Sequence, residues 1–123
     1  TQYFSQQTEL IKEIHQQLTE HLEQRFTIAE LSKQYLINTS TLKEIFKAVY
    51  GQPIATYMKE FRVRQAMKLL RETNDTIADI ASQVGYQTQG KFSSAFQSIV
   101  KMSPREYRKI QGIAPLDSFS KTL

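Results

Sequence analysis

The sequence lacks cysteine altogether and contains little glycine or proline, with four and three residues among 123. Without cysteine, the chain cannot form a disulfide scaffold, a cysteine-ligated zinc site or a thiol nucleophile. Only two histidines are present, His15 and His21, and we expect both to be solvent-exposed helix residues without a ligand role. We therefore expect no metal and no cofactor. No apolar run approaches the roughly 20 residues that span a bilayer, and no signal-peptide core is present.

The positive charge is modest in total and uneven in its distribution. The formal net charge is +4, and 40% hydrophobic and 23% charged residues are ordinary globular usage, which disfavours disorder and a membrane protein. This charge permits a polyanionic partner without requiring one. Residues 1–32 carry two basic and five acidic residues, whereas residues 33–123 carry 14 basic and seven acidic residues. An acidic N-terminal segment therefore precedes a basic body.

Apolar residues recur at helical spacing through almost the whole chain. The spacing predicts a first helix over residues 8–25, with an apolar face formed by Leu10, Ile14, Leu18 and Leu22. Thr27 and Glu30 then match a capping box, in which Thr27 caps a second helix and Glu30 bonds back to the Thr27 amide. This second helix is predicted to be short and to end near Tyr35.

An internal duplication organises the chain. The start of the second helix, Thr27-Ile28-Ala29-Glu30, occurs again 49 residues later as Thr76-Ile77-Ala78-Asp79. Further along the offset becomes 50, and it pairs Leu42 with Phe92, Phe46 with Phe96 and Tyr57 with Tyr107. One residue is therefore inserted between the two helices of the second copy. A duplication of this length predicts two similar supersecondary units.

Each copy has the proportions of a helix-turn-helix, in which a short helix, a tight turn and a second helix follow one another. In the first copy, Asn38 is predicted to cap a helix that ends at Gly51 and carries Leu42, Ile45, Phe46 and Val49. In the second copy, Thr88 is predicted to cap a helix that carries Phe92, Ala95, Phe96 and Ile99. Gly85 suits a left-handed turn position, and Leu36 stands at that position in the first copy.

Two further helices complete a predicted all-α fold of about seven helices. A long helix from Pro53 to about Arg71 has one apolar and one basic side and joins the two copies. Ser103 and Pro104 begin a last short helix, and no clear helix is predicted from Gln111 onward. The predicted division is a first helix-turn-helix subdomain over residues 1–52, a connecting helix over 53–72, a second subdomain over 73–110 and a tail over 111–123.

These residues resemble the DNA-binding domain of the AraC/XylS family of bacterial transcription regulators over roughly residues 11–108. The stretches that carry the resemblance are Arg62-x-x-x-Ala66-x-x-Leu69-Leu70, Ile77-x-x-Ile80-Ala81-x-x-x-Gly85-Tyr86, Phe92-x-x-x-Phe96 and Ser103-Pro104-x-x-Tyr107-Arg108. The resemblance implies two helix-turn-helix subdomains that bind two successive major-groove segments of double-stranded DNA. It further implies transcriptional control in the bacterial cytoplasm. Most of the family carries an additional N-terminal domain, so the start at Thr1 leads us to expect a piece of a longer regulator.

Several positions depart from the usual pattern of that family. The resemblance implies arginine where Glu44 stands, arginine or another polar reader at Ser94, and a basic residue at Gln97. Glycine is usual in place of Lys101, and a Ser-Tyr pair is usual in place of Gly90-Lys91. The core of the motif is therefore kept while the residues that read DNA are changed, so the target sequence cannot be transferred from the family.

In the first copy, the polar side of the second helix is the predicted DNA-reading face, formed by Ser40, Thr41, Lys43, Glu44 and Lys47. Lys43 can read guanine O6 and N7, Glu44 can accept from cytosine N4, and Lys47 is better suited to phosphate. Glu44 also repels phosphate, so it can act by rejecting wrong sites. The competing interpretation is a solvated charged face in which Lys43 or Glu44 pairs with Lys47.

In the second copy, the corresponding face is formed by Gln89, Gly90, Lys91, Ser93, Ser94 and Gln97. Either glutamine can make a bidentate contact with adenine, and the serines can reach phosphate or a base edge. Gly90 either lets the backbone approach DNA closely or marks a tolerant helix start. Because Lys91 is the only charge, we expect a weaker and less selective contribution from this helix. The competing interpretation is that this unit mainly grips phosphate and sets register.

Phosphate contacts are predicted at helix starts and scattered basic residues, namely Thr27, Lys33, Thr76, Lys101, Ser103 and Arg105. Arg62 is predicted to be structural, because a fixed position on the connecting helix suits an ion pair between helices. The paired aromatic residues are predicted to be core, namely Phe46, Phe96, Tyr57 and Tyr107.

No constellation typical of catalysis is present. The sequence has no P-loop, no glycine-rich dinucleotide turn and no carboxylate pair beside a histidine, so we predict no enzymatic activity. The alternative to DNA binding is a helical protein-interaction module that docks on RNA polymerase or on a partner domain. DNA binding predicts a preferred site and an affinity that falls with salt, and an interaction module predicts neither. Any dimerisation is expected through an N-terminal domain outside this sequence.

Overall fold

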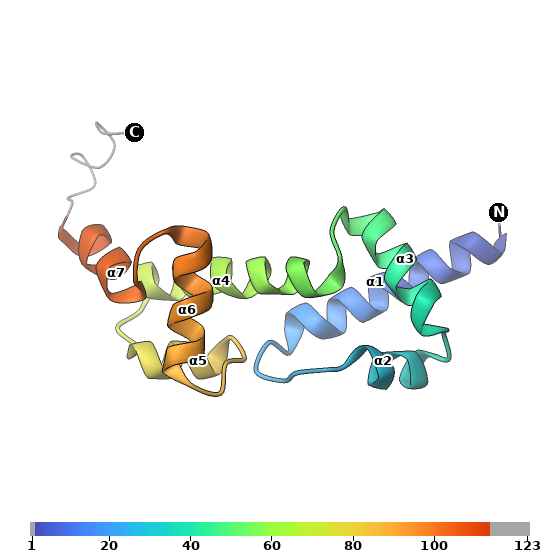
Figure 1. The fold of residues 1–123 in the computed structure, drawn as a ribbon, viewed down its shortest axis with the longest axis horizontal. Helices are drawn as coiled ribbons and strands as arrows, with labels where there is room; N and C mark the ends of the chain where they lie inside the picture. The colour runs from blue at the N-terminus through green and yellow to red at the C-terminus, as the bar shows by residue number, and fades with distance from the viewer. Residues whose placement is uncertain (1, 114–123) are drawn as a thin grey trace. The chain divides into compact units, whose positions relative to one another are not determined.

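The computed structural model describes residues 2–113, and within them the chain forms seven helices and no strand (Figure 1). The helices are α1 (Gln2–Glu20), α2 (Ile28–Tyr35), α3 (Thr39–Tyr50), α4 (Ile54–Glu72), α5 (Ile77–Gln83), α6 (Gln89–Val100) and α7 (Pro104–Ile113). The all-α prediction is confirmed. Among these residues, no helix is long and apolar enough to cross a membrane, and no group of potential ligands gathers to hold a metal ion.

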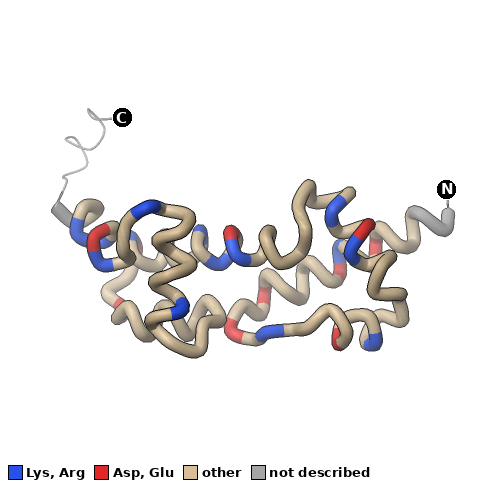
Figure 2. The backbone as a smooth tube through the Cα atoms, in the orientation of Figure 1, with Lys and Arg blue, Asp and Glu red and all other residues tan. Residues whose placement is uncertain are grey.

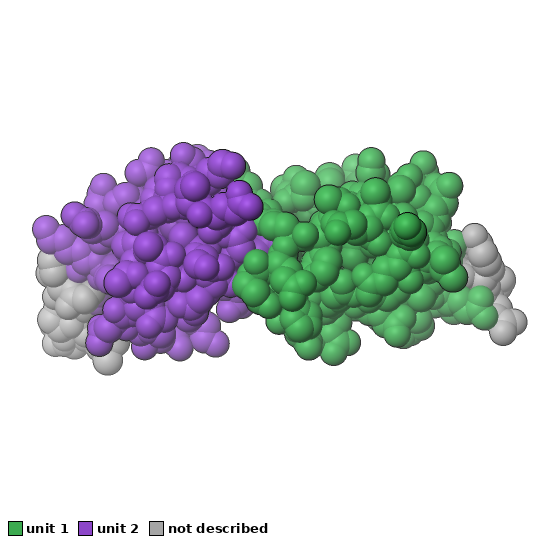
Figure 3. Space-filling view, turned by 90° about the horizontal axis from the view of Figure 1, so that it is seen from below, with its two compact units in different colours: residues 1–61 green, residues 62–123 purple. Residues whose placement is uncertain are grey.

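The chain divides into two compact units, Thr1–Phe61 and Arg62–Leu123 (Figure 3). The boundary falls inside α4, so this helix supplies residues to both cores: Met58 belongs to the first and Val63 to the second. Each unit has its own hydrophobic core and its own helix-turn-helix. The finer division into subdomains, connecting helix and tail stays a prediction.

In the first unit, α1 and α2 both pack against α3. The buried side chains of this core are Ile11, Ile14, Leu18, Leu31, Ile37, Leu42, Ile45, Phe46 and Met58. Burying a side chain of this size stabilises the fold by about 1.5–3 kcal/mol. Val49, predicted to share this apolar face, is 37% exposed in the last turn of α3, so that part of the prediction is wrong.

The first helix differs from its prediction at both ends. α1 spans Gln2–Glu20 instead of residues 8–25, and a turn follows it in which the Gln24 amide donates to the His21 carbonyl at 3.0 Å. Leu22 packs against the core from this turn. The apolar spacing at Leu22 therefore indicated a position that packs against the core but lies outside a helix. The helix ends earlier than predicted because the chain must reverse direction before α2 can begin after Thr27.

His15 lies in α1 but is not exposed as predicted, whereas His21 is exposed as predicted but lies outside a helix, because α1 ends at Glu20. His15 is half-buried; its Nε2 lies 2.8 Å from the Tyr57 hydroxyl, and its ring stacks on Tyr50 at 4.3 Å between centroids. Burial lowers the pKa of His15, because desolvation disfavours the imidazolium. The long-range partners of His15 come from α3 and α4, which explains why α1 alone gave no sign of this contact.

In the second unit, α6 packs against both α5 and α7. The buried side chains of this core are Val63, Ala66, Leu70, Ile80, Ala81, Val84, Phe92, Phe96 and Tyr107. The core assignment is confirmed for Phe46, Phe96 and Tyr107, while Tyr57 lies half-buried at the edge of the first core.

Arg62 is structural, as predicted, and is 2% exposed. Its guanidinium donates to the Val84 carbonyl at 2.7 Å, which joins α4 to the end of α5. The acceptor at this contact is a helix-terminal carbonyl. A charge-assisted bond of this kind also offsets the negative end of a helix dipole.

Arginines also hold α7 against the end of α4. Arg108 donates to the carbonyls of Leu70 and Thr73 at 3.2 and 3.1 Å, and Arg71 donates to the Tyr107 hydroxyl at 2.7 Å. α7 continues to Ile113, so the prediction of no helix from Gln111 onward is wrong for residues 111–113. The rest of the predicted tail lies outside the described residues.

Candidate nucleic-acid interface

The first helix-turn-helix begins with the capping box that the sequence predicted. The Glu30 amide donates to the Thr27 hydroxyl at 3.0 Å, and the Thr27 amide donates to the Glu30 carboxylate at 2.8 Å. The Thr27 amide, and then the Thr27 hydroxyl, lower the pKa of Glu30, because hydrogen-bond donors beside a carboxylate favour its ionised form. α2 therefore begins at a defined residue and ends at Tyr35, as predicted.

The turn before α3 places Leu36 in the left-handed region, with φ at 53° and 92% of the residue exposed. Such a backbone costs a non-glycine residue about 1–2 kcal/mol. The following Ile37 is buried, and the Asn38 side chain accepts from the Ser40 amide at 2.8 Å. Asn38 thus starts α3 as predicted, and Gly51 ends it at φ 83°.

α3 separates an apolar side from a polar side. Leu42, Ile45 and Phe46 are buried, Thr41 is half-buried at the edge, and the exposed residues of the predicted face are Ser40, Lys43, Glu44 and Lys47. Basic and acidic residues both occur along this helix (Figure 2). In the part of the chain that the structure describes, no ion pair joins Lys43 or Glu44 to Lys47. The pairing with Lys47 that accompanied the competing interpretation is therefore not seen, while the choice between a solvated charged face and a DNA-reading face stays open.

The second helix-turn-helix repeats the same devices. The Thr76 hydroxyl accepts from the Asp79 amide at 3.0 Å, and Gly85 takes the left-handed turn at φ 93°. The Thr88 hydroxyl accepts from the Lys91 amide at 3.1 Å and starts α6 as predicted. Both copies therefore present their second helix from a capped start.

α6 presents a nearly neutral face. Phe92 and Phe96 are buried, Ser93 is half-buried, and the exposed residues of the predicted face are Gln89, Gly90, Lys91, Ser94 and Gln97. A Cβ added to Gly90 would meet no atom within 4 Å, so the packing of the second unit does not require glycine there. The structure thus brings the second set together on one helix face, as it does the first set on α3.

The predicted phosphate contacts lie in different local settings. Thr27, Thr76 and Ser103 are the capping residues of α2, α5 and α7. Lys33 and Arg105 are exposed near helix ends. Lys101 adopts a left-handed φ of 68°, and its ammonium donates to the Ser98 carbonyl at 2.9 Å, so it closes its own helix. No contact of these residues with phosphate is tested, and their role stays a prediction.

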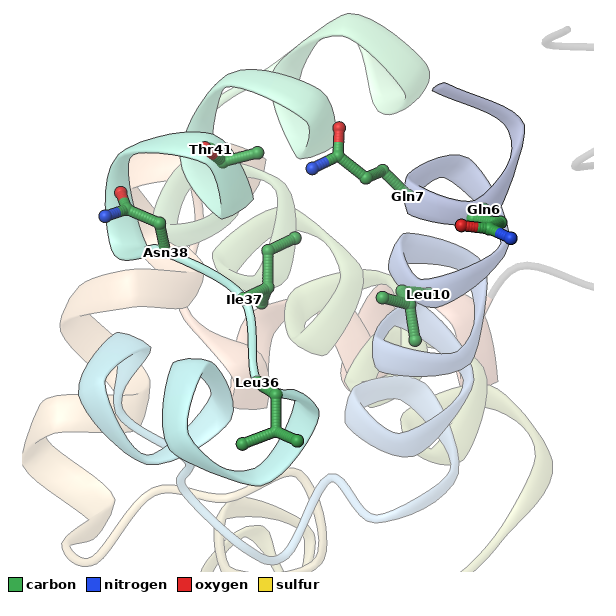
Figure 4. A pocket seen from close by; sticks show the side chains of 7 residues that line it. All are labelled: Gln6, Gln7, Leu10, Leu36, Ile37, Asn38 and Thr41. Carbon is green, nitrogen blue, oxygen red and sulfur yellow. The ribbon is translucent and has the colours of Figure 1, made fainter. Parts of the chain in front are cut away.

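A groove beside α3 escaped the sequence analysis. Side chains from α1, from the turn before α3 and from α3 itself line it, including Gln6, Gln7, Leu10, Leu36 and Thr41 (Figure 4). Gln7 and Leu10 project from α1 toward Thr41 and the turn (Figure 4). The sequence offered one sign of this groove. Leu36, an apolar residue, stands at the left-handed turn position where the second copy has Gly85.

Two helix-turn-helix copies, each with a polar outer face on its second helix, define a DNA-binding class of domain. Residues 31–110 match a family model described as a helix-turn-helix domain. The chain belongs to this family, and specifically to its AraC-type members, as the relatives below indicate.

A Streptomyces lividans protein whose name describes it as AraC-like is 39% identical over 84 residues, which is 68% of this chain and 28% of that protein. The transcriptional activator RhaR of Mannheimia succiniciproducens is 34% identical over 91 residues, covering 74% of this chain and 33% of that protein. The chain thus spans about a third of the length of these relatives.

Solved structures show the same fold. The C-terminal domain of AraT, a response regulator from Geobacillus stearothermophilus, is 27% identical, has a TM-score of 0.77, and the match covers 82% of this chain and 84% of that one. The DNA-binding domain of AdpA, solved with a target DNA, is 22% identical with a TM-score of 0.77, covering 81% of this chain and 90% of that one. At 22% identity this second likeness shows the fold alone.

Proposed function

We propose that this chain binds double-stranded DNA with sequence preference by placing α3 and α6 in the major groove. The observation that carries this proposal is the outer face of α3, where Lys43, Glu44 and Lys47 are exposed and none is tied to another in an ion pair. Ionisable groups held this way on a rigid helix are available to base edges and phosphates. The complex of AdpA with its target DNA supports the proposal by analogy of fold.

On α3, each charged residue suits a different DNA group. Lys43 lies toward the start of the helix, where it can donate to guanine O6 and N7, and Glu44 can accept from the amino group of cytosine. Lys47, one turn further along, is placed to meet phosphate. Glu44 would repel phosphate in a misplaced complex, so it selects against wrong sites as well as for a right one.

On α6, recognition has to come from neutral groups. Gln89 and Gln97 can each make the paired hydrogen bonds that adenine accepts and donates, and Ser93 or Ser94 can reach phosphate or a base edge. The open space around Gly90 allows DNA to approach the backbone there. With Lys91 as its only charge, α6 contributes less affinity and less selectivity than α3.

The longer protein of which this domain would be part is inferred to regulate transcription in the bacterial cytoplasm. The names of the relatives, among them an activator, support this inference. RNA polymerase and a dimerisation partner remain proposals for that longer protein. An enzymatic role is not supported by any of these relatives.

The test is to select bound duplexes from a random library and to titrate the affinity of the enriched duplex against salt. We expect a linear fall of log K with log salt, and a loss of affinity of about tenfold or more when Lys43→Ala and Lys47→Ala are combined. The matched control combines Lys59→Ala and Lys68→Ala, two exposed lysines of α4 that lie outside both candidate faces. If the double variant in α3 binds like the control, the assignment of the reading face is wrong.

A further inference from the structure

The groove between α1 and the start of α3 borders the DNA-reading face directly. Successive residues turn about 100° around a helix axis, so Thr41 lies a quarter-turn from Ser40 and marks the edge of the exposed face. Thr41 also lines the groove, together with Gln6 and Gln7 of α1 (Figure 4). The groove and the reading face are therefore continuous across this residue.

The dimensions of DNA determine which part of the duplex contacts the residues beside α3. A helix with its side chains is about 10–12 Å across, and the major groove is about 12 Å wide, so a seated helix nearly fills it. Protein groups that flank the helix on its DNA side must then meet the sugar–phosphate backbone at the groove wall. Because Thr41 also lines the groove with α1, a duplex held by α3 would bring its sugar–phosphate backbone to this groove.

The chemistry of the lining fits a backbone strand. Glutamine amides and threonine hydroxyls are common neutral donors to phosphate oxygens, and Gln6 is exposed while Thr41 is half-buried at the rim. Leu36 is 92% exposed and offers an apolar surface to the carbon atoms of deoxyribose. Two acidic residues lie near this lining: Glu9 of α1, whose carboxylate is 3.5 Å from the Lys12 ammonium, and Glu44, one turn after Thr41 on α3.

We propose that this groove holds one strand of the DNA backbone, with Gln6, Gln7 and Thr41 donating to phosphate oxygens and Leu36 packing against deoxyribose. The proposal rests on the proposed function, because it requires α3 to lie in the major groove. It assigns a DNA contact to α1, the helix with the acidic composition, and it gives the exposed Leu36 a partner.

The sharpest test adds a cation to the groove. Gln6→Lys is compared with Gln16→Lys, since both glutamines are exposed on α1 and only Gln6 lines the groove. Affinity is measured by fluorescence anisotropy on the enriched duplex and on a scrambled duplex over a series of salt concentrations. We expect Gln6→Lys to raise affinity about threefold on both duplexes and to steepen the salt slope by about 0.9. Equal slopes for the two variants would overturn the proposal.

A second variant removes a neutral donor without altering charge. Thr41→Val should lower affinity about fivefold on both duplexes while leaving the salt slope unchanged, because no counterion is involved. Thr56→Val, at an exposed threonine near the start of α4, is the matched control and should bind like the parent. Thermal unfolding confirms that each variant is folded, and an unchanged affinity for folded Thr41→Val contradicts the proposal.

The double variant of Lys43 and Lys47 separates the two levels of inference. If it weakens binding while the groove variants match their controls, the groove proposal fails and the proposed function stands. If it leaves binding unchanged, the reading face of α3 is wrong and the groove proposal fails with it. Lowered affinity for the double variant together with the expected groove effects supports both.

Discussion

The two helix-turn-helix copies share their caps and their core, but they differ where the helices cross and where the turn meets solvent. Ser32 on α2 is aligned with Ala81 on α5, and Leu36 is aligned with Gly85. Ala81 is buried, whereas the Ser32 hydroxyl is buried with no hydrogen-bond partner among the described residues. The second copy therefore has the residues that the motif favours, and the first copy carries two that cost stability.

The outer faces of the two copies also differ. α3 presents Lys43, Glu44 and Lys47, while α6 presents amides, hydroxyls and a single lysine. The positions that form the caps and the core constrain both copies equally, because each must begin a helix and bury an aromatic residue. The outer face and the turn carry no such constraint within each unit, so the copies diverge there. The copy that carries the two destabilising residues is also the copy whose outer face is more charged.

The largest expected effect concerns what the copies share. Phe46→Ala and Phe96→Ala remove the same fully buried ring from equivalent positions, and each should lower the free energy of unfolding by about 3–5 kcal/mol. Urea unfolding followed by residue-resolved NMR reports each unit separately. The exposed substitution Ser94→Ala serves as the control and should change stability by less than about 0.5 kcal/mol. If one substitution lowered the free energy of unfolding much less than the other, the two cores would not be equivalent.

The next effect concerns the helix crossing, where the copies differ. Ser32→Ala removes the unpartnered hydroxyl and should raise the free energy of unfolding by about 1 kcal/mol. Ala81→Ser makes the reverse change at a buried position and should lower it by about 1–3 kcal/mol. Both are measured by the same urea titration. If Ser32→Ala instead lowered the free energy of unfolding, the Ser32 hydroxyl would be stabilising the first unit.

The smallest effect concerns pH, and it is confined to the first unit, which holds both histidines. The pKa of His15 is lowered by burial below its ordinary value of about 6.5, so the unfolded chain binds this proton more readily. The contribution of neutral His15 is complete above pH 6.5 and declines as the pH falls below it. Urea midpoints of the first unit should therefore fall modestly between pH 7.5 and 5.5.

Two substitutions isolate this histidine. His15→Gln should reduce the pH dependence of the first unit, whereas Gln16→Ala, at the next and exposed position of α1, should leave it unchanged. The urea midpoint of the second unit serves as an internal reference. An unchanged pH dependence in His15→Gln would assign the effect to other groups.

Local signals predicted most of the fold and much of the candidate site. Thr27, Asn38, Thr76 and Thr88 cap helices as predicted, and Gly51 ends α3 as predicted. These features are readable because a cap and an amphipathic face depend on residues within one or two turns. On α3, Ser40, Lys43, Glu44 and Lys47 are exposed, as expected once the apolar residues of that helix are set aside, whereas Thr41 and Ser93 of the predicted faces are half-buried.

The tertiary structure alone decided features that depend on contacts between distant segments. The end of α1 at Glu20, the stacking of His15 on Tyr50 and the groove that joins Gln7 to Thr41 each involve parts of the chain that the sequence does not relate. The sequence by itself determined an all-α, duplicated helix-turn-helix domain, because caps and apolar periods act locally. Packing determined which polar residues remain exposed and which neighbours flank them, because burial is a property of the assembled core.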